Sequence, residues 1–243
     1  MATEDCTPLP ENIYKWADSI DRADETWNYW DSDISSAVAM YNAHLATLPG
    51  NMQLDWRLIK AMLWVETGPH KAAWVTRPMQ IGNAGDKGLK ELFKKSGAGS
   101  LIIPQQYKEL TPESVRKNPV DNIKAGIGYL LIELSNSDFQ SVPYGDIYEV
   151  KIKKHDNFAK IAKAEGTTVE ELELQNPGVR TLHAGDVVKC RKATMQRVIT
   201  GWKQLSLESV ARLYNSGIND PDYVVRLRYA YANITGESQF CTR

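Results

Sequence analysis

The chain has 243 residues, of which 42% are apolar and 24% are charged, close to the average of soluble globular proteins. This composition excludes a collagen-like chain, a disordered low-complexity chain and a small scaffold held together by disulfides. The 29 lysines and arginines balance 30 aspartates and glutamates, and no basic cluster interrupts that balance. We therefore expect no nucleic-acid partner, and the length predicts between one and two domains.

No segment is apolar for long enough to span a membrane. The longest apolar stretches, such as residues 126–132, fall far short of the roughly 18 residues that a bilayer requires. The first residues, MATEDCTPLPENIY, lack the basic and apolar regions of a secretory signal. We expect a protein that does not insert into membranes and that reaches any target outside the cytoplasm by another route.

Helical periodicity dominates from residue 11 to about residue 140 and predicts three well-defined helices there. The first ends at a Leu-Pro-Gly sequence, the second begins at a capping aspartate and ends at a glycine, and the third opens with Asn-Pro. Their ranges are 34–48, 55–68 and 118–134, with a looser glycine-bearing stretch over residues 69–99.

The pattern changes at Tyr144, where an alternating strand is followed by two short helices and a closing strand. The four ranges are 146–152, 158–165, 168–175 and 185–190. From Thr194 the helical pattern returns, first with Val198 and Trp202 and then in a helix capped by Ser206. The sequence thus predicts an α+β fold, a mostly helical domain with an inserted βααβ module.

The cysteines and histidines show no spacing typical of a metal site or a redox pair, so we expect no metal and no organic cofactor. These residues are Cys6, Cys190, Cys241, His44, His70, His155 and His183. Three reduced thiols are the simpler interpretation of the cysteines. A disulfide between Cys6 and Cys241 is the alternative, because the two ends of a domain often lie close together.

Glu66 has the most informative position of the carboxylates. It lies at i+4 from Met62 and i+7 from Ile59, so its side chain projects from the apolar face of its helix and near the helix C-terminus. Burial and the negative end of the helix dipole both favour the protonated form, which predicts a raised pKa and suits a general acid. The alternative is a helix-end glutamate that reaches solvent.

Three further motifs follow Glu66 in the order PMQI at 78–81, NIKAGIGYL at 122–130 and YNSG at 214–217. Gly126 and Gly128 are costly inside a helix, and we expect them to allow close packing against the helix of Glu66. The ordered set resembles the soluble lytic transglycosylases, enzymes with a lysozyme-like fold that cleave peptidoglycan. The resemblance covers residues 55–140 and 194–231.

This resemblance implies roles for the residues at matching positions. Glu66 would be the catalytic acid and base, with Tyr214 and Asn215 supporting it and the reacting sugar. The residues implied to line or border the sugar cleft are Thr67, Met79, Gln80 and Tyr129. Thr67 stands where the family commonly has serine, and core packing is an equal alternative for Met79.

Residues 147–192 resemble a LysM domain, a small fold that binds glycans containing N-acetylglucosamine, such as peptidoglycan and chitin. They share its order of strand, acidic turn, two helices, Asn-Pro and closing strand. The family's groove corresponds to the loops at 155–158 and 176–179. The residues implied in binding are Asp156, Asn157, Asn176 and Pro177. His155 stands where the family usually carries glycine, and a solvated turn residue is the favoured interpretation.

Two reaction types fit a glutamate in such a cleft. A hydrolase requires a second carboxylate as nucleophile or base. A lytic transglycosylase uses one glutamate as acid and then as base, while the C6 hydroxyl of the sugar attacks. Asp86 is the best second carboxylate and so a candidate catalytic residue, but in its Gly-Asn-Ala-Gly-Asp sequence an Asx turn is the more ordinary role. The sequence leaves the choice open.

The expected organisation is a lysozyme-like catalytic domain over residues 1–143 and 193–243 and a LysM domain over residues 144–192. The implied function is cleavage between N-acetylmuramic acid and N-acetylglucosamine at the bacterial cell wall or periplasm. A phage endolysin and an antagonistic effector both fit, and an effector would also bind an immunity protein or a secretion component. The alternatives are a non-catalytic peptidoglycan- or chitin-binding protein and a glycosidase directed at chitin.

Overall fold

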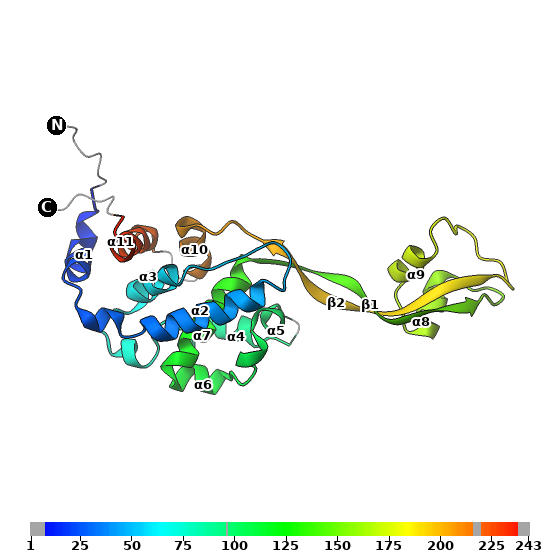
Figure 1. Cartoon of the computed structure of the whole chain (residues 1–243), viewed down its shortest axis with the longest axis horizontal. Coiled ribbons are helices and arrows are strands. Elements are labelled where there is room, and N and C mark those ends of the chain that lie inside the picture. The colour runs from blue at the N-terminus through cyan, green and yellow to red at the C-terminus, as the bar shows by residue number, and fades with distance from the viewer. Residues whose placement is uncertain (1–7, 96, 216–219, 238–243) are drawn as a thin grey trace. The chain divides into compact units, whose positions relative to one another are not determined.

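A computed structural model describes residues 8–95, 97–215 and 220–237. The described chain is mostly helical, with eleven α-helices and a two-stranded antiparallel sheet (Figure 1), which confirms the mixed α+β class. It divides into two compact units, one formed by residues up to Asn136 and from Ile199 onward, the other by residues 137–198. The inserted unit thus extends a few residues beyond the expected range of 144–192 at both ends.

The first unit contains nine of the described α-helices. Their bounds are α1 Tyr14–Asp21, α2 Asp31–Leu45, α3 Trp56–Glu66, α4 Lys87–Leu92, α5 Gly99–Ile102, α6 Pro112–Lys117, α7 Pro119–Leu134, α10 Leu207–Tyr214 and α11 Tyr223–Thr235. Short 3-10 turns lie at Glu11–Ile13, Glu25–Asn28, Ala72–Val75 and Gln105–Tyr107. None of the helices in the described ranges is long and apolar enough to cross a bilayer.

The three helices predicted from local signals are all present as α2, α3 and α7. The carboxylate of Asp55 accepts a hydrogen bond from the backbone N–H of Arg57 at the start of α3. The side chain of Asn118 accepts hydrogen bonds from two N–H groups in the first turn of α7, and Pro119 lacks an N–H there. These caps satisfy donors that have no partner within the helix, which is why the sequence marks both helix starts.

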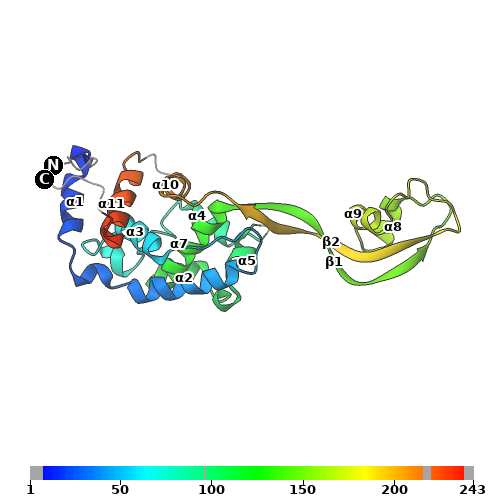
Figure 2. The same ribbon diagram turned by 45° about the horizontal axis from the view of Figure 1, so that its top comes forward.

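Helix α7 runs through the middle of the first unit (Figure 2) and contacts α2, α4, α5, α6 and α10. We predicted that Gly126 and Gly128 allow close packing against α3, and this prediction is wrong. A Cβ atom at Gly126 would lie 2.7 Å from Cβ of Met79, and one at Gly128 would lie 2.7 Å from the hydroxyl oxygen of Tyr41. The glycines therefore make room for the Met79 segment and for α2, while α3 packs mainly against α11.

Replacing Gly126 with alanine is expected to lower the free energy of unfolding by about 1 to 3 kcal/mol, because the fully buried Met79 side chain would have to move. Urea denaturation measures this change. In the double variant Gly126→Ala, Met79→Gly the Cβ atom that lies closest to the added methyl group is absent, so the combined loss should be smaller than the sum of the two single losses. Additive losses would contradict the contact.

The two strands are β1 Ser135–Lys151 and β2 Val187–Trp202. Both are longer than predicted, so the helical pattern expected for residues 135–140 and 194–202 is wrong, whereas the helix capped by Ser206 is present as α10. The apolar spacing after Thr194 matches a helix, but Ile199 is the residue that becomes buried, and the backbone pairs with the other strand instead. Just beyond the strand ends, the N–H of Lys203 donates to the carbonyl of Leu134 at 2.8 Å. Non-local pairing has overridden a local preference.

The second unit carries the two helices predicted for it, α8 Phe158–Glu165 and α9 Val169–Gln175. The side chains of Asn157 and Thr168 cap them by accepting backbone hydrogen bonds. The helices and strands enclose a hydrophobic core of their own, formed by Ile152, Ile161, Ala162, Leu172, Val188 and Cys190. This core is separate from that of the first unit.

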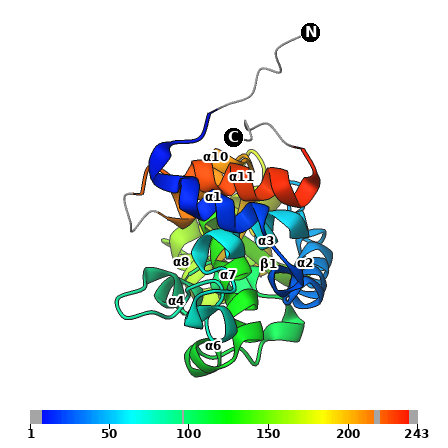
Figure 3. The ribbon, with the colours of Figure 1, turned by 90° about the vertical axis from the view of Figure 1, so that its left-hand side faces the viewer.

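Helices α1 and α11, near the two ends of the described chain, pack side by side (Figure 3). Cys6 and Cys241 lie outside the described residues, so the disulfide between them stays a prediction. Cys190 is a buried free thiol whose Sγ lies 3.4 Å from the hydroxyl oxygen of Tyr148. It belongs to the core of the second unit rather than to a reactive site.

Candidate active site

The candidate residues of the first unit gather around a pocket of about 620 Å³, a size typical of ligand sites. The residues singled out in the sequence that line it are Glu66, Met79, Gln80, Asp86, Tyr129, Tyr214 and Asn215. The remaining lining residues are Lys71, Ile81, Asn83, Ala84, Gly85 and Lys87. The end of α3, the connection from α3 to α4, the middle of α7 and the end of α10 thus contribute to one cavity.

Glu66 is the last residue of α3 and is partly buried in the pocket wall. Burial raises the pKa of Glu66 from its usual 4.5 to about 7, as its sequence position predicts. The hydrogen bond from Tyr223 and the nearby charges of Lys71 and Arg226 lower this pKa, but they do not outweigh burial. Both protonation states of the carboxyl group are therefore populated near neutral pH, as acid and base catalysis requires.

Tyr223, at the start of α11, holds the carboxyl group of Glu66. Its hydroxyl donates to Oε1 at 2.8 Å, and burial raises the pKa of Tyr223 well above its usual value, so the group stays a neutral donor. Because Oε1 accepts this bond, a proton on Glu66 is favoured on Oε2. The role of Tyr223 was not predicted from the sequence. Its only signal is helical spacing with the buried Leu227 and Ala230, which predicts a core residue rather than a site.

Tyr214 supports the pocket in a different way from the one predicted. Its hydroxyl donates to the main-chain oxygen of Met79 at 2.9 Å rather than to the carboxyl group of Glu66. Its ring packs against Tyr129, with 5.5 Å between the ring centroids. Tyr214 therefore fixes the Met79 segment and, with Tyr129, supplies an aromatic wall.

The segment from Met79 to Asn83 is held by Asn122, a fully buried residue of α7. Its Oδ1 accepts from the N–H of Met79 at 2.9 Å, and its Nδ2 donates to the carbonyl of Ile81 at 2.7 Å. Gln80 has a left-handed backbone with φ of 57°, and its Oε1 accepts from Nδ2 of Asn83 at 2.6 Å. This arrangement keeps Nε2 of Gln80 as the donor for a ligand.

Asp86 lines the pocket but is occupied by its own backbone. Oδ1 accepts from the N–H of Gly88 at 2.8 Å, and Oδ2 accepts from the N–H groups of Gly82 at 2.6 Å and of Leu89 at 3.4 Å. The carboxylate caps α4 and closes the preceding turn. This is the ordinary turn role that the sequence offered as the alternative to a second catalytic carboxylate.

Thr67 lies beside Glu66 but does not line the pocket. It is 4% exposed, and its hydroxyl oxygen lies 3.1 Å from the main-chain oxygens of both Leu63 and Pro78. The hydroxyl therefore ties the end of α3 to the segment before Met79. The role of this hydroxyl in the described structure is therefore a contact between two segments of the chain.

In the second unit, the candidate residues shape the two loops. Asp156 accepts the N–H of Lys153 at 2.7 Å, and the side chain of Asn157 caps α8. Asn176 bridges to β2, because its Oδ1 accepts the N–H of Lys189 at 2.8 Å and its Nδ2 donates to the carbonyl of the same residue at 2.7 Å. These side chains therefore order the two loops through hydrogen bonds to the backbone of the same unit. Pro177 follows directly after this bridge.

Within the described ranges, no group of three or more histidine, cysteine, aspartate or glutamate side chains is arranged to hold a metal ion. Comparisons of the chain with family models, with curated proteins and with solved structures found no match.

Replacing Tyr223 with phenylalanine is expected to raise the pKa of Glu66 further above 7, because the hydrogen bond that favours the charged form is lost. Carbon NMR of labelled glutamate carboxyl groups measures this pKa. Tyr231→Phe is the matched control, since Tyr231 also lies on α11 but donates to Asp55 at 3.2 Å. A pKa that is unchanged in Tyr223→Phe, or raised equally in both variants, would contradict this role.

Proposed function

We propose that the first unit is a lysozyme-like lytic transglycosylase that cleaves peptidoglycan between N-acetylmuramic acid and N-acetylglucosamine. The observation that carries the proposal is Glu66, a partly buried glutamate with a pKa of about 7 in the wall of a ligand-sized pocket. The same wall offers amide groups at Gln80 and Asn215 and the ring faces of two tyrosines. Acetamido sugars are bound through such hydrogen-bonding groups and apolar surfaces.

In the proposed reaction, Glu66 acts first as acid and then as base. Its proton, on Oε2, passes to the glycosidic oxygen as the bond from that oxygen to C1 of the muramic acid breaks. The C6 hydroxyl of the same sugar then attacks C1, and its proton returns to Oε2. The hydrogen bond from Tyr223 to Oε1 orients the group through both steps. The products are a 1,6-anhydro end and a free hydroxyl on the leaving sugar.

The environment of Asp86 favours transglycosylation over hydrolysis. A hydrolase would need a second carboxylate free to attack the sugar or to activate water. Among the described residues that line this pocket, Asp86 is the only carboxylate besides Glu66, and three backbone N–H groups occupy its two oxygens. A single working glutamate is sufficient for the transglycosylase reaction.

For the second unit we propose glycan binding as a LysM domain. Support comes from its order of strand, two capped helices and strand, and from its own hydrophobic core. Covalent linkage to the first unit at both ends would raise the local concentration of glycan near the pocket. Such an enzyme acts at the bacterial cell wall, as an endolysin or as an effector with its inhibitor and secretion partners.

Digestion of purified peptidoglycan followed by mass spectrometry tests the proposal. We expect fragments with 1,6-anhydro ends, lighter by one water than fragments with reducing ends. Reducing ends would show a hydrolase instead. Binding to peptidoglycan without any fragments would show a non-catalytic glycan-binding protein, and faster cleavage of chitin oligomers than of peptidoglycan would show a chitin-directed enzyme.

The variant Asp86→Asn separates the two roles of this residue. Asparagine still caps a helix, so we expect the variant to fold and to release the same anhydro products at a rate within about tenfold of the wild type. If Asp86 is instead the second catalytic carboxylate, the variant should lose activity as severely as a Glu66 variant. Reducing ends in the wild-type digest would agree with that second outcome.

A further inference from the structure

Two lysines line the proposed active-site pocket without a salt bridge to any described residue. Lys71 lies shortly after the end of α3, and Lys87 is the first residue of α4; both are exposed side chains in the pocket wall. Among the described residues, neither forms a salt bridge. The ammonium group of Lys71 donates to the main-chain oxygen of Glu66 at 3.2 Å, which is a neutral acceptor.

The acidic groups of the same pocket form no salt bridge with these lysines, although the charge of Lys71 acts on Glu66 from a longer distance and lowers its pKa. The oxygens of Asp86 accept backbone N–H groups, and Oε1 of Glu66 accepts the hydroxyl of Tyr223. Each ammonium group has three donors and prefers a charged oxygen acceptor. The pocket therefore offers two positive charges that a bound ligand could meet, beside amide and aromatic groups suited to neutral sugars.

We infer that Lys71 and Lys87 bind carboxylate groups of the glycan strand and make the pocket selective for acidic strands over neutral polymers of N-acetylglucosamine. This inference rests on the function proposed above. Every muramic acid carries a lactyl group, which is a free carboxylate in bare strands, and the stem peptides attached to it carry further carboxylates. A chitin strand has neither, so it would leave both lysines unpaired.

The expected effects are moderate, because the lysines are exposed and water competes for them. Lys71→Gln and Lys87→Gln should each raise KM for acidic strands about threefold, and the double variant about tenfold, with kcat nearly unchanged when it is measured at about pH 6, where Glu66 is mostly protonated with or without the charge of Lys71. The difference from the wild type should shrink as salt is raised from about 0.05 M to 0.5 M, because exposed charge pairs are screened. The matched control is Lys90→Gln, an exposed lysine of α4 that does not line the pocket.

The decisive comparison uses four soluble substrates with these variants. They are strands with stem peptides, strands stripped of peptides, strands whose carboxylates have been converted to neutral amides, and chitin oligomers. We expect the lysine variants to lose affinity for acidic strands only. An effect retained in stripped strands identifies the lactyl carboxylate as the partner, and an effect confined to peptide-bearing strands identifies the peptide carboxylates.

Equal changes in KM for acidic and amidated strands, or no change for any strand, would overturn the inference. A wild-type chain that cleaves no glycan would instead contradict the proposed function. To keep the two apart, strand binding is also measured by fluorescence anisotropy in a Glu66→Gln background, which does not require cleavage. If the lysine substitutions weaken the binding of acidic strands in this background by about threefold or more, the lysines recognise carboxylates whatever reaction follows. Unchanged binding would refute the inference that they do.

Discussion

Replacing Glu66 with glutamine is expected to slow glycan cleavage by about 10²- to 10⁴-fold, the share of the rate that a positioned general acid supplies. Glutamine has nearly the same size and can still accept the hydrogen bond from Tyr223. It has no proton that it could give to the glycosidic oxygen. The release of soluble fragments, measured by chromatography at pH 6, reports the loss. Wild-type activity should fall as the pH rises through about 7, since the acid is then deprotonated.

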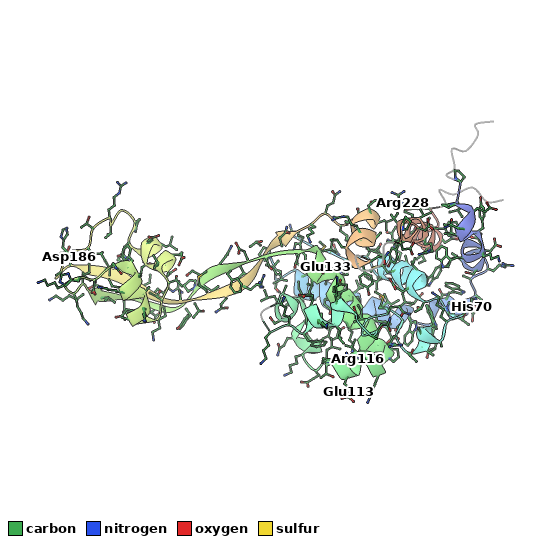
Figure 4. All side chains as sticks on the ribbon, turned by 180° about the vertical axis from the view of Figure 1, so that it is seen from behind. His70, Glu113, Arg116, Glu133, Asp186 and Arg228 are labelled. Atoms are coloured by element: carbon green, nitrogen blue, oxygen red, sulfur yellow. The ribbon has the colours of Figure 1, made fainter. Side chains whose placement is uncertain are left out.

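The matched control for this experiment is Glu133→Gln (Figure 4). Burial also raises the pKa of Glu133, a residue of α7 that does not line the pocket. We expect this variant to retain nearly all activity. A similar loss in both variants would indicate damage to the fold, and full activity in Glu66→Gln would remove Glu66 from the mechanism.

The same Glu66→Gln substitution is expected to stabilise the fold at alkaline pH. The pKa of Glu66 is about 7 in the folded chain and near 4.5 in the unfolded chain, so folding favours its protonated form. Below about pH 4.5 the group is protonated in both states and costs nothing. Between about pH 4.5 and 7 the unfolded wild type ionises this group while the folded wild type keeps it protonated, so stability falls progressively, and above about pH 7 the loss reaches its full value of about 3 kcal/mol. Glutamine does not carry this cost.

Urea denaturation at pH 4.5 and at pH 8 measures the effect. The gain in free energy of unfolding for Glu66→Gln should be small at the lower pH and close to its full value at the higher pH. Glu113→Gln is the control, because Glu113 pairs with Lys117 on the exposed surface of α6 and its removal should change stability little at either pH. A gain that does not depend on pH would refute the buried-charge explanation. A gain that grows with pH would mean that the candidate acid is maintained at the expense of stability.

Local chemistry accounts for the parts of the fold that the sequence could predict. The starts of α3 and α7 depend on Asp55 and Asn118, side chains that bond to backbone N–H groups within three residues of themselves. The burial of the Glu66 side chain follows from its position four residues after Met62, on the same face of α3. Such interactions are encoded within one or two helical turns, so a single segment is enough to reveal them.

The remaining features arise between segments that are distant in the chain. Pairing with β1 turned the helical pattern after Thr194 into strand, and the contact of Gly126 with Met79 belongs to neither local sequence. The hydroxyl that orients Glu66 comes from Tyr223, more than 150 positions away in the chain. Sequence spacing therefore predicted the burial and the raised pKa of Glu66, whereas tertiary packing decided which hydroxyl donates to its carboxyl group and which lysines line the same pocket. The reason is that the spacing of apolar residues along a helix determines which side chains face the core. The hydrogen-bond partner of such a side chain depends instead on how distant segments of the chain pack against that helix.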